Sequence, residues 1–205
     1  MTFSLHDKMN FNFKKLYMKK FFVILLLLST LLSCSDNNLI FNGSNLTEAK
    51  WDSHFELTSH KGEKKTTKDF KGKVVAIFFG FASCPDICPT TMIELKKIKF
   101  QLGKNSNQLE VLFISLDPER DTQELLSAFI PSFDSSFIGL TGTIDNIEKI
   151  TQQFKVYRKK VIQGDSYTID HSSGIYLLDK KGKIRVRHPY GSEIELIVED
   201  IKKLI

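Results

Sequence analysis

The sequence predicts an α/β fold in which helices flank a mixed central sheet. Apolar runs of strand length alternate with segments of helical periodicity from residue 74 onwards, and such alternation favours parallel strands joined by right-handed crossovers. Two of these runs, residues 74–81 and 109–116, are apolar almost throughout, which is typical of strands buried on both faces. Near the C-terminus, two strand-like runs around a turn predict a hairpin that adds antiparallel strands.

The predicted strands are short runs rich in apolar, β-branched and aromatic residues, and turn residues bound several of them. Lys61-Gly62 and Asp179-Lys180-Lys181-Gly182 are such turns. Two segments that precede the C-terminal hairpin are expected to form an extended arm. In chain order the strands are residues 55–57, 74–81, 109–116, 137–140, 174–178 and 183–187, and the arm is residues 156–162 and 167–169.

Four helices are expected where apolar residues recur every three or four positions. Pro89 opens the first, because a proline is tolerated in the first turn, and Gly103 is its expected C-cap. Pro131 is expected to stop the second helix. This order of elements is the thioredoxin arrangement, although periodicity alone leaves several α/β folds open. The helices cover residues 89–102, 122–130, 144–154 and 194–204.

Residues 1–34 have the pattern of an export signal of the bacterial lipoprotein kind. Lys19-Lys20 precedes an apolar run of 12 residues, 21–32, and Cys34 follows it. The run is shorter than the roughly 20 residues of a membrane-spanning helix and has the length of a signal-peptide core. We expect Cys34 to be the lipid attachment site, with a short uncleaved anchor as the alternative. Either anchor tethers the exported chain to a membrane, facing the periplasm or extracytoplasmic space.

The rest of the chain is expected to divide into a tether and one domain. Residues 35–50 are polar and aperiodic, which is typical of a flexible tether, and residues 51–205 are long enough for a self-sufficient core. The net charge of +5 is concentrated in residues 1–34, where five lysines and one aspartate give +4 and leave +1 for the remainder. A nucleic-acid-binding domain would carry its positive field itself. We therefore expect no binding of nucleic acid. A monomer is the default expectation, and the oligomeric state is left open.

Cys84 and Cys88 are the candidate metal ligands or redox pair. They lie where a buried strand is expected to pass through a loop into a helix N-terminus. If the loop closes into a helical turn, residues four apart share a face and both sulfurs point to one spot. The positive end of the helix favours thiolate, the form that binds metal or attacks a disulfide.

The type of donor narrows the choice of metal. Two thiolates are soft ligands that prefer Cu(I) to hard ions. Together with an imidazole they suit Cu(I) or Cu(II), and they also suit Zn, although structural Zn sites usually have four protein ligands. In an oxidising compartment the two thiols form a disulfide unless they are kept reduced or bind metal.

His171 is the candidate third ligand, because it lies in a polar segment between two extended segments. Loops carry sites more often than strand interiors do, but a lone histidine is more often a surface residue than a ligand. Asp170 is a candidate acceptor for the imidazole. The other histidines considered have no surrounding pattern, and we assign no role to His54, His60 and His188.

The segment from Leu116 to Asp121 follows the second buried strand, where catalytic loops gather in α/β folds. Its sequence, Leu-Asp-Pro-Glu-Arg-Asp, offers paired acids beside an arginine. The same residues suit a turn and a helix cap before residue 122. We favour this structural role over a catalytic one.

Three segments, in this order, resemble those of the Sco/SenC family of copper chaperones. The resemblance covers about Leu57 to the C-terminus and implies a thioredoxin-like fold that binds copper, as Cu(I) or Cu(II), through Cys84, Cys88 and His171. Ala82 replaces the threonine usual in the family, at a position that is not a ligand. The segments are Gly80-Phe81-Ala82-Ser83-Cys84-Pro85-Asp86-Ile87-Cys88-Pro89, Ser115-Leu116-Asp117-Pro118-Glu119-Arg120-Asp121 and Asp170-His171-Ser172-Ser173.

The resemblance further implies a metallochaperone, rather than an enzyme, that helps to build the dinuclear copper centre of cytochrome c oxidase. The expected partners are the copper-accepting subunit of the oxidase and an upstream copper donor or thiol reductant. In the alternative, Cys84 and Cys88 are the redox pair of a thiol–disulfide oxidoreductase that reduces the target cysteines. Their spacing disfavours a general oxidoreductase, because such motifs usually have two residues between the cysteines and this one has three. A copper or redox sensor ranks last, since the sequence has no recognisable output domain.

Overall fold

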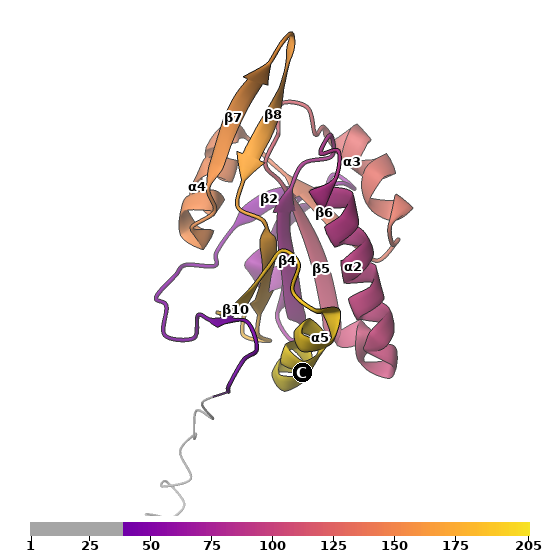
Figure 1. Ribbon diagram of the computed structural model, residues 1–205, viewed down its shortest axis with the longest axis vertical. Coiled ribbons are helices and arrows are strands. Elements are labelled where there is room, and N and C mark those ends of the chain that lie inside the picture. The colour runs from indigo at the N-terminus through magenta and orange to yellow at the C-terminus, as the bar shows by residue number, and fades with distance from the viewer. Residues whose placement is uncertain (1–38) are drawn as a thin grey trace, which may run out of the picture. The chain divides into compact units, whose positions relative to one another are not determined.

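The computed structural model describes residues 39–205, and its central feature is a mixed sheet of eight strands. Their order across the sheet is β1-β10-β9-β4-β5-β6-β2-β3, and β7 and β8 form a separate hairpin. Helices flank this sheet (Figure 1), so the predicted α/β, thioredoxin-like class is confirmed. The strands are β1 (Ser44–Asn45), β2 (Glu56–Ser59), β3 (Lys64–Thr66), β4 (Val74–Gly80), β5 (Leu109–Ser115), β6 (Ile138–Thr141), β7 (Arg158–Gln163), β8 (Ser166–His171), β9 (Gly174–Leu178) and β10 (Ile184–Pro189).

The middle of the sheet is parallel. β4 pairs with β5 over its whole length, from Val74 opposite Leu109 to Gly80 opposite Ser115, and β5 continues into parallel pairing with β6. Every residue of β4 is buried, as its unbroken apolar sequence predicts for a strand covered on both faces. The carboxyl ends of β4 and β5 therefore meet at one edge of the sheet, which is where ligand sites form in α/β folds.

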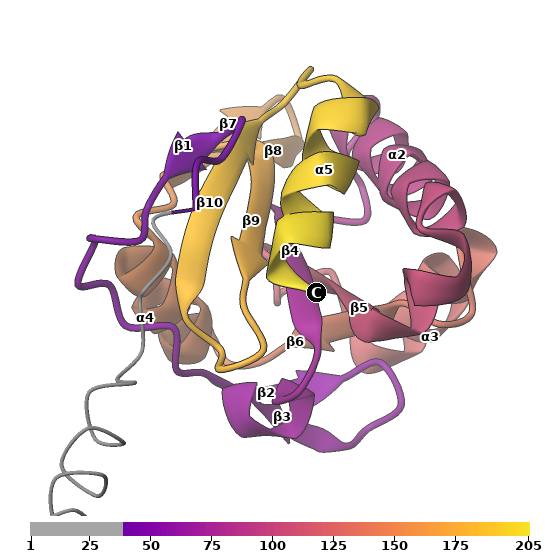
Figure 2. The same cartoon turned by 90° about the horizontal axis from the view of Figure 1, so that it is seen from below.

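Helices cover both faces of the sheet, with α2 (Ile87–Gln101), α3 (Gln123–Phe129) and α5 (Ile194–Leu204) on one face and α4 (Ile144–Phe154) on the other (Figures 1 and 2). Successive side chains of β4 point to opposite faces of the sheet. Phe79 packs against Phe154 of α4 with ring centroids 5.3 Å apart. On the opposite face, Phe78 contacts Phe113, which in turn contacts Phe129 of α3. The core thus rigidly supports the loop that follows β4.

Residues 40–50, which the sequence predicts to be part of a flexible tether, belong instead to the compact unit. The compact unit begins at Ile40 rather than at residue 51. The Asn42 and Gly43 amides donate to the buried carboxylate of Asp200 on α5, at 2.8 and 3.1 Å, and β1 pairs with β10. The polar composition predicts flexibility because it does not show that these backbone groups have partners far along the chain. The expected signal of residues 1–34, including Cys34, lies outside the described residues.

Smaller differences concern the ends of elements. The first helix begins at Ile87, two residues before Pro89, which lies within its first turn. Gly103 follows this helix with a φ of +54°, as expected for a residue beyond a helix C-terminus. Pro131 lies within a short 3-10 turn, Ile130–Ser132. The predicted arm is the hairpin of β7 and β8. Among residues 39–205 no helix is long and apolar enough to cross a bilayer.

Candidate metal centre

The two cysteines lie where β4 passes through a short loop into α2. Cys84 is half-buried in the loop, and Cys88 is fully buried in the first turn of the helix. The Cys88 amide donates to the Cys84 sulfur at 3.4 Å, and the Cys84 amide donates to the Phe81 carbonyl at 3.2 Å. Both cysteines are free thiols. The pair therefore lies at a helix N-terminus, where the sequence predicts it.

His171 reaches this loop from the end of β8, 83 residues further along the chain. Its Nε2 lies 3.9 Å from the Cys88 sulfur, and its ring meets the ring of Phe81 edge-on at 5.9 Å between centroids. Nδ1 lies 3.0 Å from the Ser172 carbonyl oxygen. Because a carbonyl oxygen only accepts hydrogen bonds, Nδ1 carries the hydrogen and Nε2 presents its lone pair to the cysteine. The Ser172 carbonyl, rather than Asp170, orients the imidazole.

Burial keeps both of these groups neutral in the metal-free protein. Burial raises the pKa of the Cys88 thiol well above its usual value, and burial also lowers the pKa of His171. A neutral imidazole is the form that binds a metal. The thiol must lose its proton to do so, and binding of a soft metal ion therefore releases a proton.

A surface pocket of about 230 Å³ opens over the site. Cys84 and His171 line it, and Cys88 lies beneath its wall. The pocket gives a reactant access to Cys84 and the imidazole, whereas Cys88 is buried and is not part of its lining. Its lining is Phe81, Cys84, Pro85, Asp86, Ile87, Thr168, Ile169, Asp170, His171 and Ser173.

The described residues fit a soft metal by donor type but not as a preformed cage. Within residues 39–205, no group of three or more His, Cys, Asp or Glu side chains converges as a metal site. Cys88 and His171 already face each other, whereas the Cys84 sulfur lies against the helix N-terminus. Cys84 and His171 nevertheless line the same pocket, so all three side chains lie in one region of the molecule.

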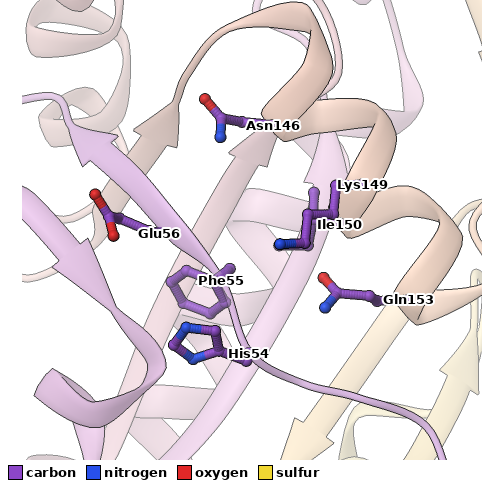
Figure 3. A pocket seen from close by; sticks show the side chains of 7 residues that line it. All are labelled: His54, Phe55, Glu56, Asn146, Lys149, Ile150 and Gln153. Carbon is purple, nitrogen blue, oxygen red and sulfur yellow. The ribbon is translucent and has the colours of Figure 1, made fainter.

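The other histidines lie elsewhere. His60 accepts a hydrogen bond from the Gly139 amide through Nδ1 at 3.1 Å, and Nε2 of His188 lies 3.0 Å from the Asp200 carboxylate. His54 lines a separate surface pocket, where it lies beside Phe55 and faces Lys149 and other side chains of α4 (Figure 3). None of the three is among the residues that line the pocket of Cys84 and His171.

The segment from Leu116 to Asp121 contains the expected turn, but it does not cap the next helix, because the Thr122 side chain does so by accepting from the Leu125 amide at 3.2 Å. Asp117 and Asp121 are fully buried. Asp121 accepts hydrogen bonds from the Ala82 amide and the Ser115 hydroxyl, and Asp117 pairs with Arg120. The sequence assigns no role to Phe81 or Ser172, although they lie in the segments Gly80–Pro89 and Asp170–Ser173.

Comparisons with known proteins agree with this geometry. The family model described as SCO1/SenC matches residues 44–205. A SCO2-like protein of Rickettsia felis is 38% identical over 151 residues, which are 72% of this chain and 74% of that protein. The solved structure of Bradyrhizobium japonicum ScoI with copper bound is 37% identical, has a TM-score of 0.69 and covers 74% of this chain and 98% of that one.

A second solved structure, a SCO1/SenC family lipoprotein from Bacillus anthracis, is 29% identical with a TM-score of 0.68, and it covers 76% of this chain and 96% of its own. The match of the family model extends over the whole domain, from β1 to the C-terminus. The chain therefore belongs to the SCO1/SenC family.

Proposed function

We propose that this protein is a copper metallochaperone, which binds one copper ion through Cys84, Cys88 and His171. The observation that carries the proposal is the 3.9 Å approach of His171 Nε2 to the Cys88 sulfur, beside a second cysteine at the same helix N-terminus. Two sulfurs and one imidazole are donors that copper prefers. The copper-bound ScoI of B. japonicum, 37% identical, supports copper as the cargo.

The acceptor we propose is the dinuclear copper centre of cytochrome c oxidase, as the family resemblance implies. Cys84 and His171 line the open pocket, so thiolates of an acceptor subunit can displace them before the buried Cys88 releases the ion. Oxidation of Cys84 and Cys88 to a disulfide removes both sulfur ligands, and delivery then depends on the redox state of the pair. An upstream copper donor or thiol reductant must reload the protein.

An anaerobic titration of the reduced protein with Cu(I) tests the ligand set. We expect one tightly bound ion per chain, no tight binding by the Cys84→Ser/Cys88→Ser variant, and binding weakened by about tenfold or more in His171→Ala. His54→Ala is the matched control, since His54 lies in a separate pocket, and it should bind as the parent does. Binding that is indifferent to His171 would remove the three-ligand site from the account.

A thiol–disulfide oxidoreductase is the second candidate function. It is favoured by the unequal exposure of the two cysteines, because Cys84 lines the pocket and Cys88 is buried behind it. This is the arrangement of an attacking and a resolving thiol. His171→Ala separates the two functions, since copper binding should weaken while reduction of a disulfide peptide by the reduced protein should continue. Loss of peptide reduction with intact copper binding would reverse the ranking.

We also propose that Cys34 carries a lipid that holds the domain at the outer face of a membrane, with the preceding residues removed as a signal. The pattern of residues 19–34 supports this, as does the similarity to a B. anthracis protein described as a lipoprotein. Mass spectrometry of the membrane fraction should find a lipidated Cys34 at the N-terminus. An intact N-terminus before Cys34 would instead support an uncleaved anchor.

A further inference from the structure

We propose that Arg120 is a positioning residue for copper binding, because it holds the hairpin that carries His171 against the loop that carries Cys84. This inference rests on the proposed copper function and adds a residue outside the ligand set. Arg120 belongs to the segment Leu116–Asp121, which follows β5 at the carboxyl edge of the sheet. That segment contacts both ligand-bearing elements.

The hairpin of β7 and β8 needs such a support, because its two strands pair only with each other among the described strands. No ladder of the main sheet holds it, so its position depends on side-chain contacts. One of these is the bond from Arg158 Nε to the Leu116 carbonyl at 2.6 Å. Arg158 is the β7 residue directly opposite His171 in the hairpin register.

Arg120 makes the second attachment, to Tyr167 on the same strand as His171. Its Nη1 donates to the Tyr167 carbonyl at 2.9 Å, and its guanidinium carbon lies 3.7 Å from the centre of the Tyr167 ring. Its Nε donates to the buried carboxylate of Asp117, which also accepts from the Tyr167 hydroxyl at 2.9 Å. Arg120, Asp117 and Tyr167 therefore form a closed set of charge-assisted contacts, which are stronger than neutral ones.

The same segment holds the cysteine loop. The Asp121 carboxylate accepts from the Ala82 amide at 3.0 Å and from the Ser115 hydroxyl at 2.6 Å. The Arg120 guanidinium also lies 5.9 Å from the ring of Phe81, the residue that meets His171 edge-on. One short segment thus sets the distance between the cysteines and the imidazole.

Without Arg120, Tyr167 of β8 would lose the hydrogen bond to its carbonyl and the guanidinium stacked on its ring. His171 would then no longer be held over Cys88. Groups that orient metal ligands from behind typically contribute about 10- to 100-fold in metal affinity. We expect a loss of Cu(I) affinity in this range for Arg120→Ala. Since that variant also leaves the buried Asp117 carboxylate without its cationic partner, Arg120→Lys is the second variant. Lysine keeps the charge beside Asp117 but cannot bond Asp117 and Tyr167 together from one planar fork.

The test is a double-mutant cycle with His171, read as Cu(I) affinity in competition with a chromophoric chelator. Arg120→Ala and Arg120→Lys should weaken binding in the parent protein, but by less than about twofold in a His171→Ala background, because their effect passes through His171. The matched control is Arg185→Ala. Arg185 pairs with Asp179 at 2.6 Å, near the start of β4 and so at the other end of the sheet, and its loss should leave copper affinity unchanged.

A second readout uses the metal-free protein. Hydrogen exchange of the amides of residues 166–171 should be faster in Arg120→Lys than in the parent or in Arg185→Ala. Equal losses of affinity in both His171 backgrounds, or no loss at all, would overturn the inference while leaving the copper function standing. If the parent protein binds no copper, the proposed function fails, and unchanged exchange in β8 would then overturn the positioning role as well.

Discussion

Cys84, Cys88 and His171, the ligands proposed for copper, lie in three different environments. Cys88 is buried with its pKa raised by that burial, and it contacts an imidazole whose free nitrogen points at its sulfur. Cys84 lies at the pocket wall. Under the proposed copper function, an acceptor would reach Cys84 and His171 at the pocket first and the buried Cys88 last.

Gly80 lies directly against the Cys88 sulfur and leaves no room for a larger residue. A Cβ at this position would lie 2.9 Å from that sulfur and 3.0 Å from the ring of Phe113. Overpacking of this kind costs about 1–3 kcal/mol. We predict that Gly80→Ala lowers the free energy of unfolding by this amount, measured by urea denaturation, and weakens Cu(I) binding because the sulfur must move.

Ser83→Ala provides the comparison for that variant, since Ser83 is an exposed residue of the loop that follows Gly80. It should change neither stability nor copper affinity. If Gly80→Ala is destabilised but binds copper as tightly as the parent, the position of the Cys88 sulfur does not limit binding.

At the scale of elements, the N-terminal segment is held to α5 by one buried carboxylate. Asp200 accepts from the amides of Asn42 and Gly43 and from Lys203 at 2.8 Å, and it lies 3.0 Å from His188. Removing one partner of a buried charged network typically costs about 3–5 kcal/mol. We predict a large loss of stability in Asp200→Ala, together with new proteolytic cleavage between residues 40 and 50.

Limited proteolysis followed by mass spectrometry would locate that cleavage. Lys202→Ala, at an exposed position of the same helix, is the control and should resist the protease as the parent does. Resistance of Asp200→Ala in this segment would mean that the pairing of β1 with β10 alone holds the segment in place.

The elements differ in how far the sequence could predict them. The apolar run of β4 and the periodicity of α4 and α5 predict those elements almost to the residue, because local patterns reflect burial directly. The attachment of residues 42–46 was missed, because its partner Asp200 lies 158 residues away from Asn42. The contact between Cys88 and His171, 83 residues apart, likewise follows from topology and not from any local pattern. The family resemblance supplied it as an expectation.

At the scale of the whole molecule, buried histidines make stability depend on pH. Burial lowers the pKa of both His60 and His188. A histidine whose pKa is lower in the folded than in the unfolded state, where it is about 6.5, stabilises the fold above that value. Its contribution is lost as the pH falls below 6.5 towards the folded pKa. The raised pKa of Asp121, which results from burial, acts in the opposite direction.

We therefore predict that the free energy of unfolding of the metal-free protein depends less steeply on pH between 7 and 5 in His188→Gln than in the parent. Chemical denaturation at a series of pH values measures this. Parallel curves for the two proteins would mean that His188 does not contribute to the acid sensitivity.

The ligand set of the copper ion is the central claim, and X-ray absorption at the copper edge of the Cu(I)-loaded protein tests it most directly. The account predicts two sulfur neighbours and one nitrogen neighbour in the parent, and loss of the nitrogen alone in His171→Ala. A parent spectrum with sulfur neighbours only, or a nitrogen that survives in His171→Ala, would contradict copper binding by Cys84, Cys88 and His171.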